Sequence, residues 1–412
     1  MKHLFIYCLN TVVLSYLSYL FYRLIKQSKW KVYFMSALAF KLICGVLLGL
    51  LYIWLYDGGD TFGYYERASR IAEFGWGDFW SLMFSSVDST FHARREYLDR
   101  VLAVILFLGK TDYWMASFYF SYFSFICSAY LVRQVIEWRP DWSKAAIFSF
   151  LFYPSIVFWS SGILKESLAF GAVMVLMGGY IKLRANKKFL WYEFLWYFLS
   201  FLILVYLKYY ILAVILPLLA YLLIFRRLEQ LDFLKNSLWR KTAFILAMLV
   251  APTIGMLYWL NYNLTIEYFW SSIQNTHHYI LSRTPIWNKV PIVDTSNEFM
   301  NYVLNFIHFT IAGVFRPIFP EVFRFPNIMS AIENLLLIVI IGWRFISSTK
   351  VRYNADLIAI TILIVSMAFF LAFSIPNLGA LARFKVYYMP FLMVVILIDH
   401  PLWNKFDFLK RL

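Results

Sequence analysis

Long apolar runs separated by short polar clusters make up most of this 412-residue chain. A bilayer core of about 30 Å requires about 20 apolar residues per helix, and about eleven runs approach that length. They cover residues 4–22, 33–56, 113–133, 145–161, 166–183, 189–206, 209–225, 241–261, 327–346, 355–374 and 385–399. The pattern predicts an all-α, polytopic integral membrane protein with about eleven transmembrane helices, forming a single transmembrane domain over residues 1–412. Residues 99–109 and 301–316 are alternative spans or re-entrant segments.

The positions of the charged residues orient these helices. Hydrophobic residues make up 62% of the chain and charged residues 15%, and the net charge of +15 comes from short basic clusters between the apolar runs. The positive-inside rule places such clusters in the cytoplasm. We therefore predict an N-terminus outside, a C-terminus inside and two large extracytoplasmic loops, residues 57–112 and 262–326. Because the bases are topology signals, no nucleic-acid partner is expected.

The first of these loops contains an amphipathic pattern directly behind an apolar run. Apolar and aromatic residues recur there at spacings of three and four, which predicts a helix lying on the membrane surface. The stripe consists of Tyr64, Tyr65, Ala68, Ile71, Ala72 and Phe74. Asp60 lies at the start of this helix, after two glycines. An aspartate there is either a helix cap, which stabilises by about 1 kcal/mol, or a functional carboxylate. One cap leaves Asp57 and Glu66 unexplained, so Asp60 and Asp57 are candidate catalytic residues.

A second candidate site is the turn between two apolar runs at Lys165 and Glu166. Ionisable groups beside membrane helices are costly and usually face a cavity or a partner. The alternative interpretation is that Lys165 extends to the membrane interface and that Glu166 is favoured by the dipole of the helix it begins.

Other charged residues follow the same pattern and are predicted near the outer ends of spans. They are Lys208, Arg316, Glu321, Glu333, Arg383 and Lys385. Together these residues predict a ring of acids and bases around one extracytoplasmic vestibule, above a membrane midplane with almost no charge. Arginine and lysine bind phosphate oxygens well, so the bases indicate an anionic head group presented from the bilayer. A nearby carboxylate is suited to removing a proton from an incoming hydroxyl.

The first loop resembles that of GT-C fold glycosyltransferases. In those proteins a membrane helix leads into an outside loop with an Asp, then a Tyr pair and a surface helix, matched here by Asp60, Tyr64, Tyr65 and Ala68. The stretches PSIVFWSSGILKES and NLGALARFKVYYMPF also resemble bacterial membrane proteins of that group. The rest of the chain matches only in topology. Two apolar runs precede the loop, where the family usually has one.

This resemblance implies an enzyme of a bacterial cytoplasmic (inner) membrane with its active site facing outside. It would move a sugar from a polyprenyl-phosphate-linked donor to a lipid-linked or polysaccharide acceptor, in cell-surface polysaccharide or glycolipid assembly. Under this hypothesis Asp60 is the general base, and Asp57 and Glu166 are further catalytic candidates. The substrate-binding candidates are Tyr64, Tyr65, Lys165, Lys208, Arg316, Glu321, Glu333, Arg383 and Lys385.

No cofactor is expected, and no residue is assigned to a metal. The Asp57–Asp60 spacing departs from a strict Asp-X-Asp motif, which leaves metal use open. Two other functions fit parts of the pattern. Repeat-unit polymerases of surface polysaccharides have similar helix counts, an early outside Asp-Tyr loop and essential outside bases. A transporter or flippase would instead place its ionisable groups near the midplane, on broken helices in related halves.

Overall fold

The computed structural model is all-helical in the part of the chain that it describes, with one isolated bridge between Lys289 and Asn377 and no strands. The described residues are 2–85, 93–228, 240, 243–244, 266–319, 321, 325–347 and 355–405. The all-α prediction is therefore confirmed for these ranges.

Seven helices in the described residues are long and apolar enough to cross a membrane, which supports a polytopic membrane protein. They lie within α1 (Lys2–Ile25), α2 (Lys31–Tyr56), α6 (Tyr113–Trp138), α9 (Lys165–Arg184), α10 (Trp191–Leu228), α15 (Phe325–Ile346) and α16 (Ala355–Ser374). An eighth span is formed if α17 (Leu378–Phe384), η4 (Lys385–Tyr387) and α18 (Met389–Leu397), which together bend by 63°, count as one.

Three of the predicted spans take a different form. The run 145–161 is broken into α7 (Ser143–Ile147), a π-helical turn and α8 (Pro154–Trp159), because Pro154 lacks an N–H and restricts the residue before it to extended backbone. The runs 189–206 and 209–225 form the two helical segments of α10, which are separated by a kink at Lys208, where the backbone is non-helical. The predicted span 241–261 lies outside the described residues, apart from residues 243 and 244, which are helical.

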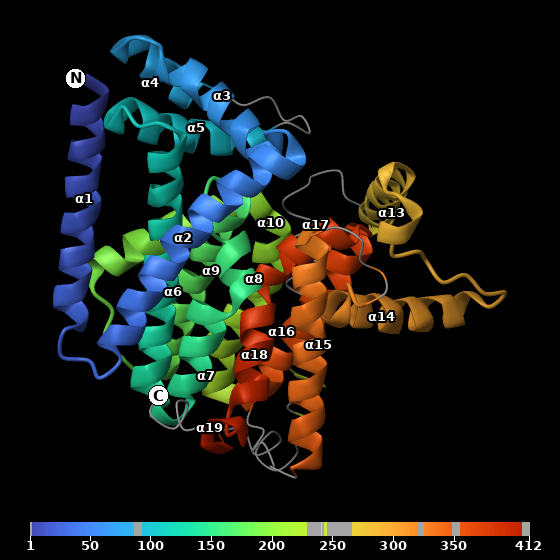
Figure 1. Ribbon diagram of the computed structural model, residues 1–412. Helices are drawn as coiled ribbons and strands as arrows, with labels where there is room; N and C mark the ends of the chain where they lie inside the picture. Colours follow the sequence, from blue (N-terminus) through green and yellow to red (C-terminus); the bar gives the residue numbers. More distant parts are fainter. Residues whose placement is uncertain are drawn as a thin grey trace. The chain divides into compact units, whose positions relative to one another are not determined.

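The chain divides into two compact units, which are described separately (Figure 1). The first unit contains residues 1–138 and 150–209, and the second contains residues 139–149 and 210–412. In the first unit α6 packs against α2 and α9, while α3 (Gly59–Ala72) packs against α5 (Ala93–Gly109). The short helix α4 (Trp76–Phe84) adds Phe79 to the buried cluster formed by α3 and α5.

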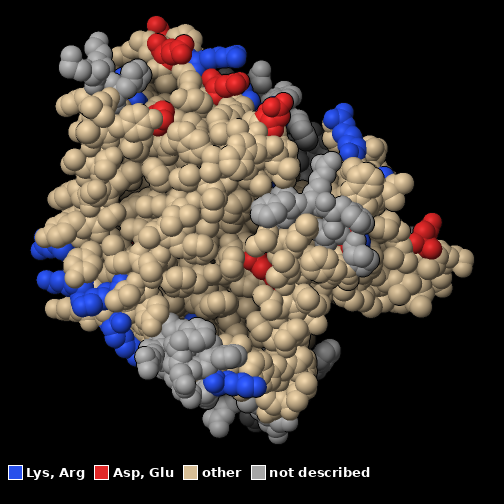
Figure 2. All heavy atoms as spheres, viewed as in Figure 1, with Lys and Arg blue, Asp and Glu red and all other residues tan. Residues whose placement is uncertain are grey.

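Charges are distributed unevenly over the first unit (Figure 2). Acidic and basic side chains occur together around α3 and α5, whereas the connection between α1 and α2 shows only bases on the face in view. That connection carries exposed Lys26 and Lys29. This distribution is the one that the positive-inside rule gives when the α1–α2 connection faces the cytoplasm.

In the second unit α14 (Glu298–Phe315) and α16 approach each other closely. A Cβ added at Gly313 would lie 2.4 Å from the backbone oxygen of Ala368, and the Tyr388 hydroxyl donates to the Gly313 carbonyl at 2.7 Å. Buried Phe309, Ala312 and other apolar residues form the cluster around this contact. The remaining described elements of this unit are α13 (Ile266–Arg283), η1 (Pro140–Trp142), η3 (Ile286–Asn288) and α19 (Leu402–Lys405).

Gly313→Val is therefore expected to destabilise the protein by about 1–3 kcal/mol, since the added carbons must displace backbone rather than a flexible side chain. Gly342→Val on α15 is the matched control, because nothing lies within 4 Å of a Cβ there. Thermal unfolding of both detergent-solubilised variants tests this. Equal stability of the two variants would contradict the close α14–α16 contact.

Candidate functional site

The end of α2 and the start of α3 place Asp57 and Asp60 in different settings. Asp57 follows α2 with left-handed backbone (φ 50°, ψ 48°), and the Gly58 N–H closes that helix end by donating to the Tyr52 carbonyl at 2.8 Å. Gly58 is the N-cap of α3, and Asp60 lies in the first helical turn. The cap interpretation of Asp60 is thus wrong. Both aspartates are exposed.

One face of α3 carries a carboxylate, a phenol and a guanidinium. Asp60, Tyr64 and Arg67 follow one another at spacings of four and three, which aligns them along the helix. Tyr64 and Ala68, from the predicted apolar stripe, are buried in the cluster that α3 forms with α5, whereas Phe74 is exposed. A helix is therefore present over Gly59–Ala72, where the amphipathic pattern predicts one, and part of its apolar stripe packs against protein. Its position on a membrane surface stays a prediction. Tyr65 packs edge-on against Tyr113, and their ring centroids lie 5.7 Å apart.

Arg67 links α3 to α5 through a carboxylate that sequence reasoning missed. Its guanidinium donates to both oxygens of Asp99, at 2.6 and 3.2 Å, and Asp99 is buried. Burial raises the pKa of Asp99 above its ordinary value, although Arg67, Lys165 and Arg95 act in the opposite direction. Two cations lie near the Tyr64 ring: the Arg67 guanidinium is 5.3 Å and the Lys165 ammonium 5.4 Å from its centroid.

The turn before α9 brings Lys165 and Glu166 to this cluster. Gly162 has left-handed backbone (φ 65°), which a side chain adopts only with strain, and a Cβ there would lie 2.8 Å from Leu48. Glu166 is buried in the first turn of α9, and Lys165 is half-buried. The Lys165 ammonium interacts with the charges of Asp60, Glu166, Lys208 and Arg95. The predicted acid–base turn is present, and it faces α3.

Lys208 completes the cluster from within α10. Its backbone is non-helical (φ −150°, ψ 54°), and its ammonium lies 3.2 Å from a carboxylate oxygen of Glu166. Both side chains are buried, with 7% and 4% of their surfaces exposed. Lys208 was expected at an outer turn between two spans. A break is present at this position, as a kink within α10, and the charge of Lys208 is balanced there by Glu166.

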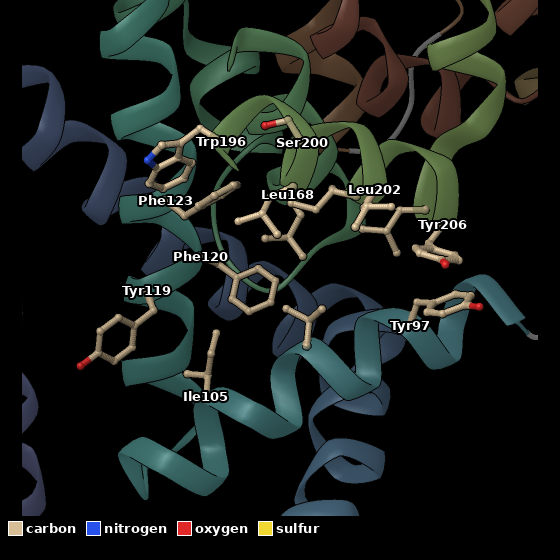
Figure 3. A pocket seen from close by; sticks show the side chains of 14 residues that line it. Tyr97, Ile105, Tyr119, Phe120, Phe123, Leu168, Trp196, Ser200, Leu202 and Tyr206 are labelled. Carbon is tan, nitrogen blue, oxygen red and sulfur yellow. The ribbon is translucent and has the colours of Figure 1, made fainter. Parts of the chain in front are cut away.

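An apolar groove of about 460 Å³ runs beside this charged cluster between α5, α6, α9 and α10. At one end Tyr97 faces Tyr206, with ring centroids 4.2 Å apart, and toward the other end lie Tyr119 and Trp196 (Figure 3). Two of its wall residues adjoin cluster residues in the sequence. Leu168 lies one turn after Lys165, and Leu207 directly precedes Lys208. Leu168, Leu207 and Tyr64 also share one buried cluster.

The interior of the first unit contains a buried lysine that was not among the predicted site residues. Lys41, three turns into α2, is buried, and its ammonium bonds the Val157 carbonyl and the Ser160 hydroxyl where α8 ends. The same ammonium lies 5.3 Å from the centroid of the Phe170 ring. These contacts of Lys41 fix the end of α8, and the chain continues from there to Lys165 and Glu166.

The remaining predicted residues belong to the second unit. Arg316 forms an ion pair with Glu321 at 2.7 Å, and the Arg383 guanidinium lies 5.8 Å from the Phe384 ring centroid. The buried Lys385 ammonium donates to the Val314 carbonyl at 2.8 Å and the Asn334 amide oxygen at 3.2 Å, and it interacts with the charge of Glu333. Their assignment to a phosphate site, and the single ring of charges that would join them to the first unit, stay predictions.

In the described part of the chain, no three His, Cys, Asp or Glu side chains gather in a group able to hold a metal ion. The expectation about metals is untested. A comparison of the sequence with protein-family models and curated proteins, and of the fold with solved structures, finds no match.

Proposed function

We propose that this protein is a membrane glycosyltransferase that uses a polyprenyl-phosphate-linked sugar donor. The observation that carries the proposal is the apolar groove with a charged cluster beside it, both built from the first unit. A substrate with a long apolar chain and a charged head group matches this combination, since the chain fills the groove while the phosphate meets cations. The acceptor belongs to cell-surface polysaccharide or glycolipid assembly, and the active site faces outside.

Each residue of the cluster has a separate role in the proposed reaction. Asp60, exposed at the start of α3, takes the proton from the acceptor hydroxyl. The hydroxyl oxygen then forms a bond to the anomeric carbon as the bond from that carbon to the phosphate oxygen breaks. The departing polyprenyl phosphate keeps the electron pair, and Lys165 stabilises its charge because this lysine is only half-buried. Lys208 is already balanced by Glu166, so this pair holds α9 and α10 in position.

Filling the groove tests this proposal. Val101 lines the groove from α5 and is 41% exposed, so Val101→Trp changes the groove while leaving the buried face of α5 intact. We expect KM for a long-chain donor to rise at least about tenfold with kcat nearly unchanged. The groove contacts the lipid chain equally in the bound ground state and in the transition state, so losing that contact weakens binding without slowing the chemical step. KM for a donor with a short lipid chain should change much less.

Leu108→Trp provides the matched control, because Leu108 is 60% exposed on the same helix and does not line the groove. Kinetics measured with purified, reconstituted protein compare the two variants. If Val101→Trp behaves like Leu108→Trp with the long-chain donor, the groove does not hold the lipid.

A further inference from the structure

The first unit has a second cavity, of about 400 Å³, near the opposite end of α9. Its walls come from α1, α6, α9, α10 and the connection between α9 and α10. Trp196 lines both this cavity and the apolar groove, but none of the charged residues assigned to sugar transfer lines the cavity. Lys182 reaches it from the last turns of α9, whereas Lys165 begins that helix. The helical rise between these two residues is about 25 Å, so the cavity and the transfer site are separate.

Paired charges form the polar wall of this cavity. The Lys182 ammonium donates to both Glu193 oxygens at 2.6 Å. Arg133 donates to Glu137 at 2.9 Å, and Lys187 donates to the other oxygen of the same carboxylate. Three bases and two acids thus line the cavity. A ligand there meets both signs of charge at short range, which favours a zwitterion over a simple anion or cation.

A buried polar atom in the same wall lacks a partner. Gln134 lines the cavity and is 7% exposed, and its side-chain oxygen Oε1 is buried without a hydrogen bond. A buried carbonyl oxygen in this state costs free energy, which a donor from a ligand would recover once rotation of the Gln134 amide turns the oxygen toward the cavity. Gln134 follows Arg133 and lies three residues before Glu137 on α6, so a donor that reaches it also lies near that carboxylate.

The rest of the wall is apolar, which indicates an amphiphilic ligand. Leu24, Ile126, Val175 and Leu190 line this part, and Leu24 and Leu190 are exposed on the surface. The cavity also lies at the ends of three candidate membrane spans, those of α6, α9 and α10. Lipid head groups occupy this level of a bilayer, with their chains extending along the apolar helix faces.

We propose that this cavity binds the phosphoethanolamine head group of a membrane phospholipid. The phosphate accepts hydrogen bonds from Arg133 and Lys187, and the ammonium donates to Glu137 and to Oε1 of Gln134. A choline head group has no N–H to donate, and a glycerol head group has hydroxyls but no cation for Glu137. The proposal is independent of the sugar-transfer function, because it uses other residues.

Lipid titration of the delipidated, full-length protein, followed by native mass spectrometry, tests this site. Phosphatidylethanolamine should bind at least about tenfold more tightly than phosphatidylcholine or phosphatidylglycerol with the same acyl chains, since each competitor loses a charge-assisted hydrogen bond. Gln134→Leu keeps the size of the side chain and removes the amide. We expect it to lose about tenfold in affinity for phosphatidylethanolamine while its Tm stays equal or rises, because a buried polar group without a partner has been removed.

Ser128→Ala, also buried on α6 but outside the cavity, serves as the control and should bind lipid as the unaltered protein does. Equal affinity for the three lipids, a preference for phosphatidylglycerol, or unchanged binding by Gln134→Leu would overturn the proposal. Competition with soluble O-phosphoethanolamine tests whether the cavity needs the lipid chains. If it displaces the lipid at comparable concentration, the cavity takes a free zwitterion and the assignment to a lipid is wrong.

Discussion

Asp60→Asn is expected to slow sugar transfer by about 10²–10⁴-fold, which is the usual contribution of a positioned general base. The variant should remain folded, because Asp60 is exposed and is not the N-cap of α3. It loses its charge interaction with Lys165 and its favourable interaction with the helix N-terminus. The latter interaction is worth about 0.3–1 kcal/mol. Transfer from a lipid-linked donor, measured at equal protein levels in membranes, checks the rate, and thermal unfolding checks the fold.

Asp57→Asn is the matched control, because Asp57 is an equally exposed aspartate three residues earlier that lies outside α3. Its effect on transfer should be much smaller. If Asp57→Asn is inactive while Asp60→Asn stays within a few-fold of the unaltered protein, the base has been assigned to the wrong aspartate. Activity of both variants would show that this loop is not the catalytic centre.

Removing one partner of the Glu166–Lys208 pair should cost about 3–5 kcal/mol of stability, because the remaining charge is left buried without its counter-ion. Glu166→Gln and Lys208→Met are the variants that test this, by thermal unfolding in detergent. Both side chains are more than nine-tenths buried and lie 3.2 Å apart. A surface ion pair would change stability by only about 0–1 kcal/mol, so small effects in both variants would contradict the burial of this pair.

The double variant separates packing from catalysis. Glu166→Gln combined with Lys208→Met removes both charges and should recover most of the stability that either single change loses. Transfer activity should return with it if the pair only positions α9 and α10. A stable double variant without activity would instead show that Glu166 acts directly in the reaction, as the sequence hypothesis has it.

The sequence predicts the long helices well, because their length and apolar content are local properties. Runs such as 33–56 and 113–133 correspond to α2 and α6 within a few residues. The errors arise where the backbone departs from a straight helix. At Pro154 the missing N–H was a visible signal for a break that the predicted span 145–161 did not use, whereas the predicted runs 189–206 and 209–225 already leave a gap at Lys208. The burial of Lys208 depends on Glu166, 42 residues away.

The candidate site was predictable where its chemistry lies on one stretch of chain. Asp60, Tyr64 and Lys165 could be selected because acids, aromatics and bases stand out beside apolar runs. Asp99 was missed because its partner Arg67 is 32 residues away, so its role depends on how α3 packs against α5. Lys41 was the more visible omission, since a lysine inside an apolar run is itself a signal of a buried polar contact.

The most direct test of the proposed sugar transfer is to follow what happens to the lipid-linked donor. The purified full-length protein is reconstituted in vesicles with a polyprenyl-phosphate-linked, radiolabelled sugar and an acceptor, and the donor and released polyprenyl phosphate are quantified over time. Sugar transfer predicts acceptor-dependent loss of the donor with equal release of polyprenyl phosphate, and Asp60→Asn should slow both by about 10²–10⁴-fold. An intact donor that only moves between the two leaflets would contradict the account and identify a transporter.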